Sequence, residues 1–135
     1  MRSAIYTAET ATTAGIVNGG TLPIGSVSKR TGCGLSLNGR SINIHETGMY
    51  QVVANFTVAP SANDRFTIRA MKDGVAIPGA ETTFSAAAAV TMPIAFLVKH
   101  VCCKDSCNIY FDISSVTAST TFTLSSAAVT VVKLV

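Results

Sequence analysis

Charged residues are scarce in this sequence of 135 residues. Asp, Glu, Lys and Arg together supply 13% of the chain, about half the share of an average soluble domain, whereas hydrophobic residues supply 48%. A monomer with so little charge has difficulty covering its surface, while an oligomer hides much of that surface from water. The composition therefore favours a chain that associates with copies of itself.

Clustered basic residues are also lacking. The net charge is +3, and of the ten Lys and Arg residues only Lys29 and Arg30 are adjacent. A nucleic-acid-binding face needs its cations gathered on one side, so no nucleic-acid partner is predicted. The longest uncharged runs, residues 82–98 and 113–132, are interrupted by Ser and Thr. Such runs indicate strands and predict no membrane partner.

No set of residues indicates catalysis. His45 and His100 are expected to be exposed, one in a turn and one at a strand end, and the seven acidic residues fall mostly in turns. Ser–His–acid chemistry needs a base held against a nucleophile by a third group, and glycoside hydrolysis needs two carboxylates at a fixed separation. We therefore predict that the chain is not an enzyme and has no catalytic residue and no cofactor.

Cysteines are few but three of them are close together. Cys102, Cys103 and Cys107 surround an expected turn, while Cys33 is far from them in the sequence. One alternative is a disulfide from Cys102 or Cys103 to Cys107, which needs the Cα atoms about 4.4–6.8 Å apart. A second is a set of half-buried free thiols. A structural metal is less favoured because the spacing is irregular and His100 is the only nearby histidine, so no metal site is predicted.

The apolar residues follow the pattern of an all-β chain. Val, Ile, Thr and Phe alternate with polar residues, Gly, Asn and Asp interrupt them, and no window keeps a helical period. The longest strand leaves a Glu-Thr-Gly turn at residue 48. Its inward positions are expected to be Tyr50, Val52, Ala54, Phe56 and Val58.

The remaining strands are shorter or less regular. Residues 89–101 are apolar on both faces, which is typical of a strand between two layers or at a subunit contact. A short strand over residues 75–77 is expected to end at the Pro78-Gly79 turn. We predict about eight to ten strands in one sandwich domain over residues 21–135. Residues 1–20 are expected to form an N-terminal arm with the first strand and a flexible loop.

Three segments in order carry a family resemblance. The first is the alternating set Ile42, Ile44, Glu46, Gly48 and Tyr50. The second is Lys-Asp-Gly at residues 72–74 followed by Ile-Pro-Gly at 77–79, and the third is Val-Thr-Val-Val-Lys-Leu at 129–134. Together they resemble the complement/tumour-necrosis-factor-like trimeric jelly roll. The closest form is the bacterial and phage type, found in spore-surface collagen-like glycoproteins and in phage head or tail fibres.

The resemblance implies a fold and an assembly. The family forms a two-sheet jelly-roll sandwich of antiparallel strands that packs as a homotrimer around a threefold axis. By that resemblance Tyr50 lies near the axis and the last strand ends close to it. The residues expected in the core or the trimer interface are Tyr50, Val52, Phe96 and Val131.

Two functions follow from the resemblance. The first is a non-enzymatic component of a phage virion, either a capsid decoration or head fibre or a tail-fibre module, attached to other virion proteins through the arm. The alternative is a trimeric adhesin on a phage, bacterial or spore surface. It would bind a receptor or host-surface glycan through the loops at residues 59–64 and 115–120. The absence of Trp argues against a strong sugar-binding platform.

Overall fold

The computed structural model describes residues 3–100 and 106–135. Within these residues the chain forms eleven β-strands and no helix, so the all-β prediction is confirmed. The strands are β1 (Ala4–Glu9), β2 (Thr13–Ile16), β3 (Ser26–Thr31), β4 (Leu35–Asn38), β5 (Ser41–Ile44), β6 (Gly48–Pro60), β7 (Asp64–Lys72), β8 (Val75–Ala86), β9 (Val90–His100), β10 (Cys107–Ser115) and β11 (Phe122–Lys133). The described part of the chain contains no helix long and apolar enough to cross a membrane.

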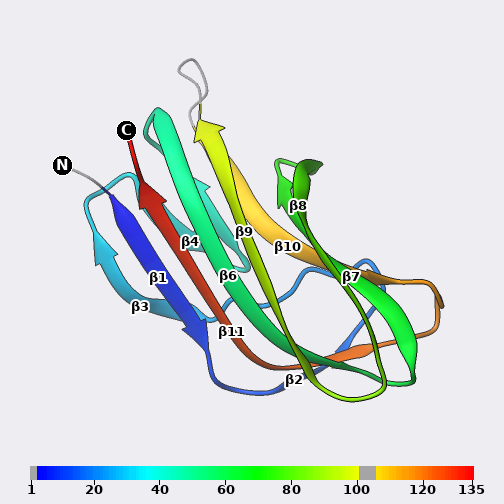
Figure 1. Cartoon of the computed structure of the whole chain (residues 1–135). Coiled ribbons are helices and arrows are strands. Elements are labelled where there is room, and N and C mark those ends of the chain that lie inside the picture. Colours follow the sequence, from blue (N-terminus) through cyan, green and yellow to red (C-terminus); the bar gives the residue numbers. More distant parts are fainter. Residues whose placement is uncertain (1–2, 101–105) are drawn as a thin grey trace.

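The strands form two antiparallel sheets that face each other (Figure 1). The six-stranded sheet has the order β3-β1-β11-β6-β9, and β2 pairs with the first half of β11. The five-stranded sheet has the order β4-β5-β10-β7-β8. The chain changes sheets between β3 and β4, between β5 and β6, between β6 and β7, between β8 and β9, and on both sides of β10. Such repeated crossing between two layers is the jelly-roll arrangement.

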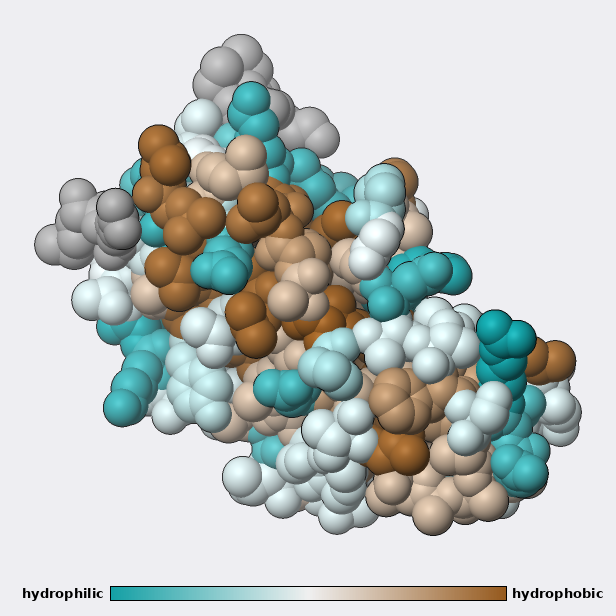
Figure 2. All heavy atoms as spheres, viewed as in Figure 1, coloured by the Kyte–Doolittle hydropathy of each residue, from teal (hydrophilic) through white to brown (hydrophobic). Residues whose placement is uncertain are grey.

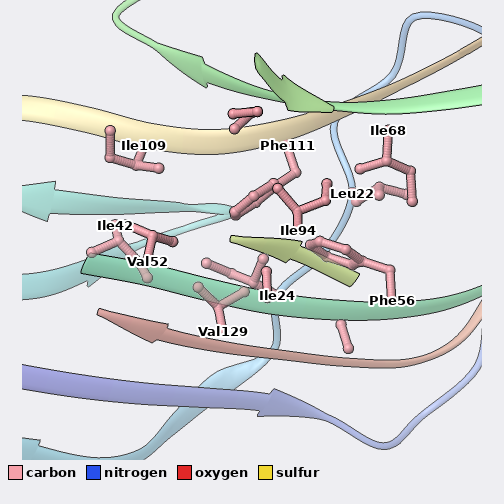
Figure 3. Packing of buried hydrophobic residues seen from close by; sticks show 14 of the residues in the cluster. Leu22, Ile24, Ile42, Val52, Phe56, Ile68, Ile94, Ile109, Phe111 and Val129 are labelled. Carbon is pink, nitrogen blue, oxygen red and sulfur yellow. The ribbon is translucent and has the colours of Figure 1, made fainter. Parts of the chain in front are cut away.

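The core lies between the sheets and is built by strand alternation. Successive side chains of a strand point to opposite faces, so every second residue can be buried. Phe56 of β6 lies 5.0 Å from Phe111 of β10, and Phe66 of β7 lies 5.4 Å from Phe122 of β11, measured between ring centroids. Each pair joins one sheet to the other. Figure 3 shows Phe56 and Phe111 among the aliphatic side chains that fill the space around them.

Strand β6 is an interior strand of the six-stranded sheet. It pairs with β11 on one side and with β9 on the other, over almost its whole length. All five side chains predicted to point inward are fully buried, whereas the alternate positions Gln51, Val53 and Asn55 are exposed. The prediction for this strand is confirmed, because a strict alternation over many residues fixes which face enters the core.

Within residues 1–20 the expected first strand is present as β1, but the expectation of a flexible loop is wrong for residues 13–16, which form β2. Strand β1 pairs with both β11 and β3, and β2 pairs with β11. Ile5 and Ile16 are buried in the core that the rest of the chain forms. The segment around Ile16 consists of Thr, Ala and Gly, which gives little alternation to read, but its backbone still completes the edge of the sheet. These residues therefore belong to the sandwich.

The expected end of the strand at Pro78-Gly79 is also wrong. Strand β8 continues to Ala86, and the pairing with β7 shifts register between Arg69 and Met71, opposite this point. Gly79 has a φ of 76°, a left-handed conformation suited to glycine at an irregularity in a strand. Pro78 is tolerated because β8 is an edge strand and one of its sides is unpaired within the sheet.

Candidate functional site

The outer face of the six-stranded sheet carries an uncharged surface. Its outward side chains form three rows across β1, β11, β6 and β9, set by the strand register. The rows are Tyr6, Thr130, Val53 and Ala95; Ala4, Val132, Gln51 and Leu97; and Ala8, Ala128, Asn55 and Pro93. We call these twelve residues the uncharged face. Val53 is 41% exposed and Leu97 is 56% exposed, so large apolar groups there meet water in the single chain.

The two outer faces of the sandwich carry their charged side chains differently: on the six-stranded sheet Lys29 of β3 and Lys99 of β9 lie at the margins of the uncharged face. Figure 2 shows brown and tan atoms gathered over β11, β6 and β9, with polar atoms scattered among them. The outer face of the five-stranded sheet carries instead the charged side chains of Arg65, Arg69, Glu81 and Asp112. Contiguous apolar surface rimmed by polar residues marks an interaction site in soluble proteins. The uncharged face is therefore the candidate contact surface of this molecule.

The four residues expected at the trimer interface or in the core lie on the inner side of this sheet. Tyr50, Val52 and Val131 are fully buried, and Phe96 is partly buried with its ring 6.2 Å from that of Phe111. A side chain on the inner face points away from any copy that docks on the outer face. Sequence alternation separates the two faces of a strand, but it does not say which of them remains open to a partner.

Glu46 and Tyr50 make hydrogen bonds at the end of the sandwich where β1 begins and β11 ends. The Tyr50 hydroxyl donates to the Glu46 carbonyl oxygen at 2.7 Å. The Glu46 carboxylate accepts from Lys133 Nζ at 3.1 Å and from Ser3 Oγ at 3.0 Å. The turn before β6 is therefore tied to the first and the last strands of the chain. These hydrogen bonds explain why the chain has a glutamate at position 46 and a tyrosine at position 50.

These contacts change the acidity of two groups. The hydrogen bond from Lys133, followed by the one from Ser3, holds the pKa of Glu46 below its ordinary value. Burial, followed by the nearby Glu46 charge, raises the pKa of Tyr50 to about 12. At neutral pH Glu46 is therefore charged and Tyr50 is neutral, and neither group changes its protonation state there. Both side chains have a structural role in these contacts.

The loops expected to carry ligand binding lie side by side. Asp64 Oδ2 accepts from Thr117 N at 3.1 Å and from Thr120 Oγ1 at 2.9 Å, which joins the turn after β6 to the loop after β10. The Asn18 amide adds hydrogen bonds to both backbone groups of Ser115. We call residues 17–20, 60–64 and 115–121 the loop end.

The Asp64 carboxylate stabilises the loop end through hydrogen bonds. Desolvation opposes the charge of Asp64, but the hydrogen bonds from Thr120, Arg65 and Thr117 outweigh it and hold the pKa below its ordinary value. Two apolar side chains of the loop end point into water, Val17 at 61% and Val116 at 77% exposure. The sequence analysis selected two of these loops. The Asn18-Gly19-Gly20 sequence also indicates a turn, but it does not predict that this turn lies beside the other two loops.

The cysteine alternatives stay open. Cys102 and Cys103 lie outside the described residues, so the predicted disulfide to Cys107 remains a prediction. Cys107 begins β10 and is buried, and Cys33 is an exposed free thiol between β3 and β4. Among the described residues, no three His, Cys, Asp or Glu side chains gather into a potential metal site.

The two histidines differ from each other. His45 is exposed, with Nε2 2.8 Å from Ser36 Oγ, and no carboxylate of the described residues is hydrogen-bonded to its ring. A Ser–His pair without an orienting third group lacks the geometry of a catalytic triad. His100 is only 1% exposed at the end of β9. The expectation that His100 is exposed was wrong, because it falls on the inward alternation of β9 along with Val98.

No protein-family model and no curated protein matches the sequence. Solved structures do resemble the chain. Murine APRIL, at pH 5.0, superposes with a TM-score of 0.71 at 15% identity, over 99% of this chain and 100% of APRIL. The globular domain of zebrafish complement 1qA gives 0.69 at 8% identity, over 100% and 92%. The PRD1 vertex protein P5 gives 0.64 at 17% identity, over 98% and 97%.

The likeness establishes the fold. The chain is a two-sheet, antiparallel jelly-roll sandwich of the tumour-necrosis-factor-like type, as the sequence predicted. Identities of this size carry no information on partners or activity, and the bacterial or phage type of the fold remains an interpretation of the sequence motifs.

Proposed function

We propose that the chain is a homotrimeric structural module of a virion, a capsid decoration or head fibre or a tail-fibre module, and not an enzyme. The observation that carries the proposal is the uncharged face, which leaves Val53 and Leu97 exposed on a chain with only 13% charged residues. Burial against a second copy removes this apolar surface from water and stabilises the assembly. The virion setting rests on the family resemblance and on the likeness in fold to the PRD1 vertex protein P5.

A closed ring of identical subunits needs two different contact surfaces on each copy. The second surface of this chain is the groove where the β7–β8 hairpin meets β9, with a volume of about 310 Å³. Its apolar wall consists of Val75, Ile77, Pro78 and Leu97, and Lys72 and Lys99 also line the groove. Leu97 belongs to both surfaces, so they are continuous around the β9 edge. In the proposed trimer this edge packs against the uncharged face of the next copy.

Light scattering of the purified chain tests the proposed assembly. We expect a particle of three times the 14.0 kDa chain mass at micromolar concentration. A stable monomer of 14.0 kDa under these conditions would contradict the proposal. Mass spectrometry of purified particles tests the virion setting, and absence of the chain from intact particles would oppose it.

A second candidate function is adhesion through the loop end. The observation that favours it is the pair of exposed apolar side chains, Val17 and Val116, on loops that hydrogen bonds hold together. Such a tip would bind a receptor or a host-surface glycan while the sheets maintain the assembly. A host-cell adsorption assay of the double variant Val17→Ser and Val116→Ser distinguishes the two functions. Adsorption falls if the loop end is an adhesin. It stays unchanged if the chain only decorates the particle.

A further inference from the structure

The outer face of the five-stranded sheet holds a polar pocket of about 400 Å³. It is lined by Thr21, Arg40, Ser41, Asn108 and Tyr110, which come from β5, β10 and the segments before β3 and β5. Its volume lies within the range of about 300–1,000 Å³ that small-molecule sites occupy. The pocket faces away from the uncharged face, so it stays open to water when copies of the chain associate there.

Arg40 supplies a cation at this pocket that has no carboxylate partner among the described residues. Its Nη1 donates to the Thr21 carbonyl oxygen at 2.8 Å, and this bond fixes the guanidinium at the pocket wall. Arg69 on the same face is instead paired with Glu81 at 3.0 Å. The acid next to the pocket is Asp112, whose Oδ1 accepts from Thr21 Oγ1 at 2.9 Å. The remaining guanidinium N–H groups can bind a carboxylate.

Two neighbouring amides have unused hydrogen-bonding capacity. Asn43 and Asn108 are direct register partners on β5 and β10. The side-chain oxygen of each is buried without a hydrogen-bond partner among the described residues. Buried acceptors are normally paired, so such a group calls for an explanation. Asn108 also lines the pocket, where its side-chain amide is a hydrogen-bonding group for a ligand hydroxyl.

Tyr110 adds an aromatic ring to the lining of the pocket. It is half-buried, and it follows Asn108 by two residues, so both side chains point to the same face of β10. An aromatic ring beside polar groups offers an apolar surface for the C–H face of a ring-shaped ligand and a hydroxyl for its edge. The lining therefore combines one cation, several neutral polar groups and one aromatic ring.

We propose that this pocket binds an acidic monosaccharide unit, of the hexuronate or sialic acid class. The carboxylate pairs with Arg40, ring hydroxyls bond to Asn108 and Ser41, and the sugar ring packs on Tyr110. A single cation among neutral polar groups suits a singly charged carboxylate on a polyol. A phosphate group is matched better by several cations or backbone N–H groups. The proposal does not rest on the proposed trimer, because all the lining residues belong to one chain.

Titration of the perdeuterated, ¹⁵N-labelled chain with D-glucuronate tests the proposal, with D-glucose as the matched neutral sugar. We expect saturable shifts of the backbone amide signals of Thr21, Ser41, Asn108 and Tyr110. Binding of glucose should be at least tenfold weaker. Arg40→Gln should remove the preference for glucuronate, and Tyr110→Ser should weaken binding of both sugars. Arg65→Gln, on the same sheet but outside the pocket, should leave both affinities unchanged.

Each other outcome overturns a defined part of the proposal. Equal binding of glucose and glucuronate excludes the carboxylate contact with Arg40. Saturable shifts confined to the loop end place the sugar site elsewhere. The absence of saturable shifts with glucuronate and with N-acetylneuraminate excludes the site as a whole. The mass of the particle is measured separately, so failure of the sugar site and failure of the proposed trimer are distinguishable.

Discussion

Tyr50 shows how one side chain serves both the core and a turn. Its ring is fully buried between the sheets, while its hydroxyl reaches back to the Glu46 carbonyl oxygen at 2.7 Å. Burial of an aromatic ring is among the larger single contributions to the stability of a small domain. The hydroxyl contributes less, because folding only exchanges a hydrogen bond to water for one to the protein.

Substitutions at Tyr50 separate these two contributions. We expect Tyr50→Ala to lower the free energy of unfolding by about 3–5 kcal/mol, since it removes a large ring and leaves a cavity. Tyr50→Phe keeps the ring and should cost about 1 kcal/mol for the lost hydrogen bond. Urea unfolding followed by circular dichroism measures both. A Tyr50→Ala variant as stable as its parent would show that this ring is not a core residue.

The Glu46 carboxylate makes stability depend on pH. Its pKa is lower in the folded chain than its ordinary value of 4.5, chiefly because Lys133 and Ser3 donate hydrogen bonds to the charged form. A group with a lowered folded pKa stabilises the fold fully above the ordinary pKa, and this stabilisation is lost as pH falls through the folded pKa. The contribution of Glu46 is therefore present at neutral pH and disappears in acid.

Glu46→Gln should show this dependence. The variant should unfold at a lower urea concentration than the parent at about pH 7, and the difference should shrink as the pH falls below about 4.5. Urea unfolding midpoints measured across this pH range check the expectation. A difference that stays constant with pH would mean that the charge on Glu46 does not contribute.

At the scale of the strands, β3 depends on a close approach to β1. Gly25 immediately precedes β3 and has a φ of 82°, and a methyl group at this position would overlap the backbone carbonyl of Ala8. Gly39, in the turn between β4 and β5, also has a positive φ, but nothing lies near the place its methyl group would take. The two glycines therefore share a conformation and differ in their surroundings.

Alanine substitutions at the two glycines test this packing. Gly39→Ala should cost about 1–2 kcal/mol for the left-handed backbone. Gly25→Ala should cost about 3 kcal/mol or more, because the β1–β3 contact must also move. Thermal denaturation of both variants gives the comparison. Equal effects would mean that β3 shifts freely relative to β1.

The strands also show how far sequence reasoning extends at this scale. The long alternating run of β6 was predicted with the correct inner face, because burial selects every second side chain. Strand β2 was missed, and the continuity of β8 through Pro78 and Gly79 was not predicted. They are edge strands of small or polar residues, and backbone pairing with a neighbour holds them in place. A sequence pattern records side-chain burial well and records backbone pairing poorly.

For the whole molecule, the difference between its two outer faces leads to a prediction about assembly. A carboxylate introduced at Val53 lies in the middle of the uncharged face, where a docked copy would bury it without a partner. Val53→Glu should therefore raise the dissociation constant of the assembly at least about 30-fold, equivalent to about 2 kcal/mol. Sedimentation equilibrium over a range of concentrations measures this change.

The matched control carries the same charge on the opposite face. Ser114 lies on β10, opposite Thr67, on the outer side of the five-stranded sheet. Ser114→Glu should leave the assembly unchanged, because this face stays in water. If both variants dissociate equally, the contact does not depend on the uncharged face. If neither dissociates, the copies meet on another surface.

The sequence by itself determined the all-β class, the two faces of the long strands and the low charge that favours association. These properties follow from the alternation and composition of the chain, which act over a few residues at a time. Only the tertiary structure decided which side of β6 remains exposed, that residues 4–16 complete the six-stranded sheet, and that Arg40 and Asn108 line one pocket. Those facts depend on which strands become neighbours, and that pairing is settled by packing between segments far apart in the chain.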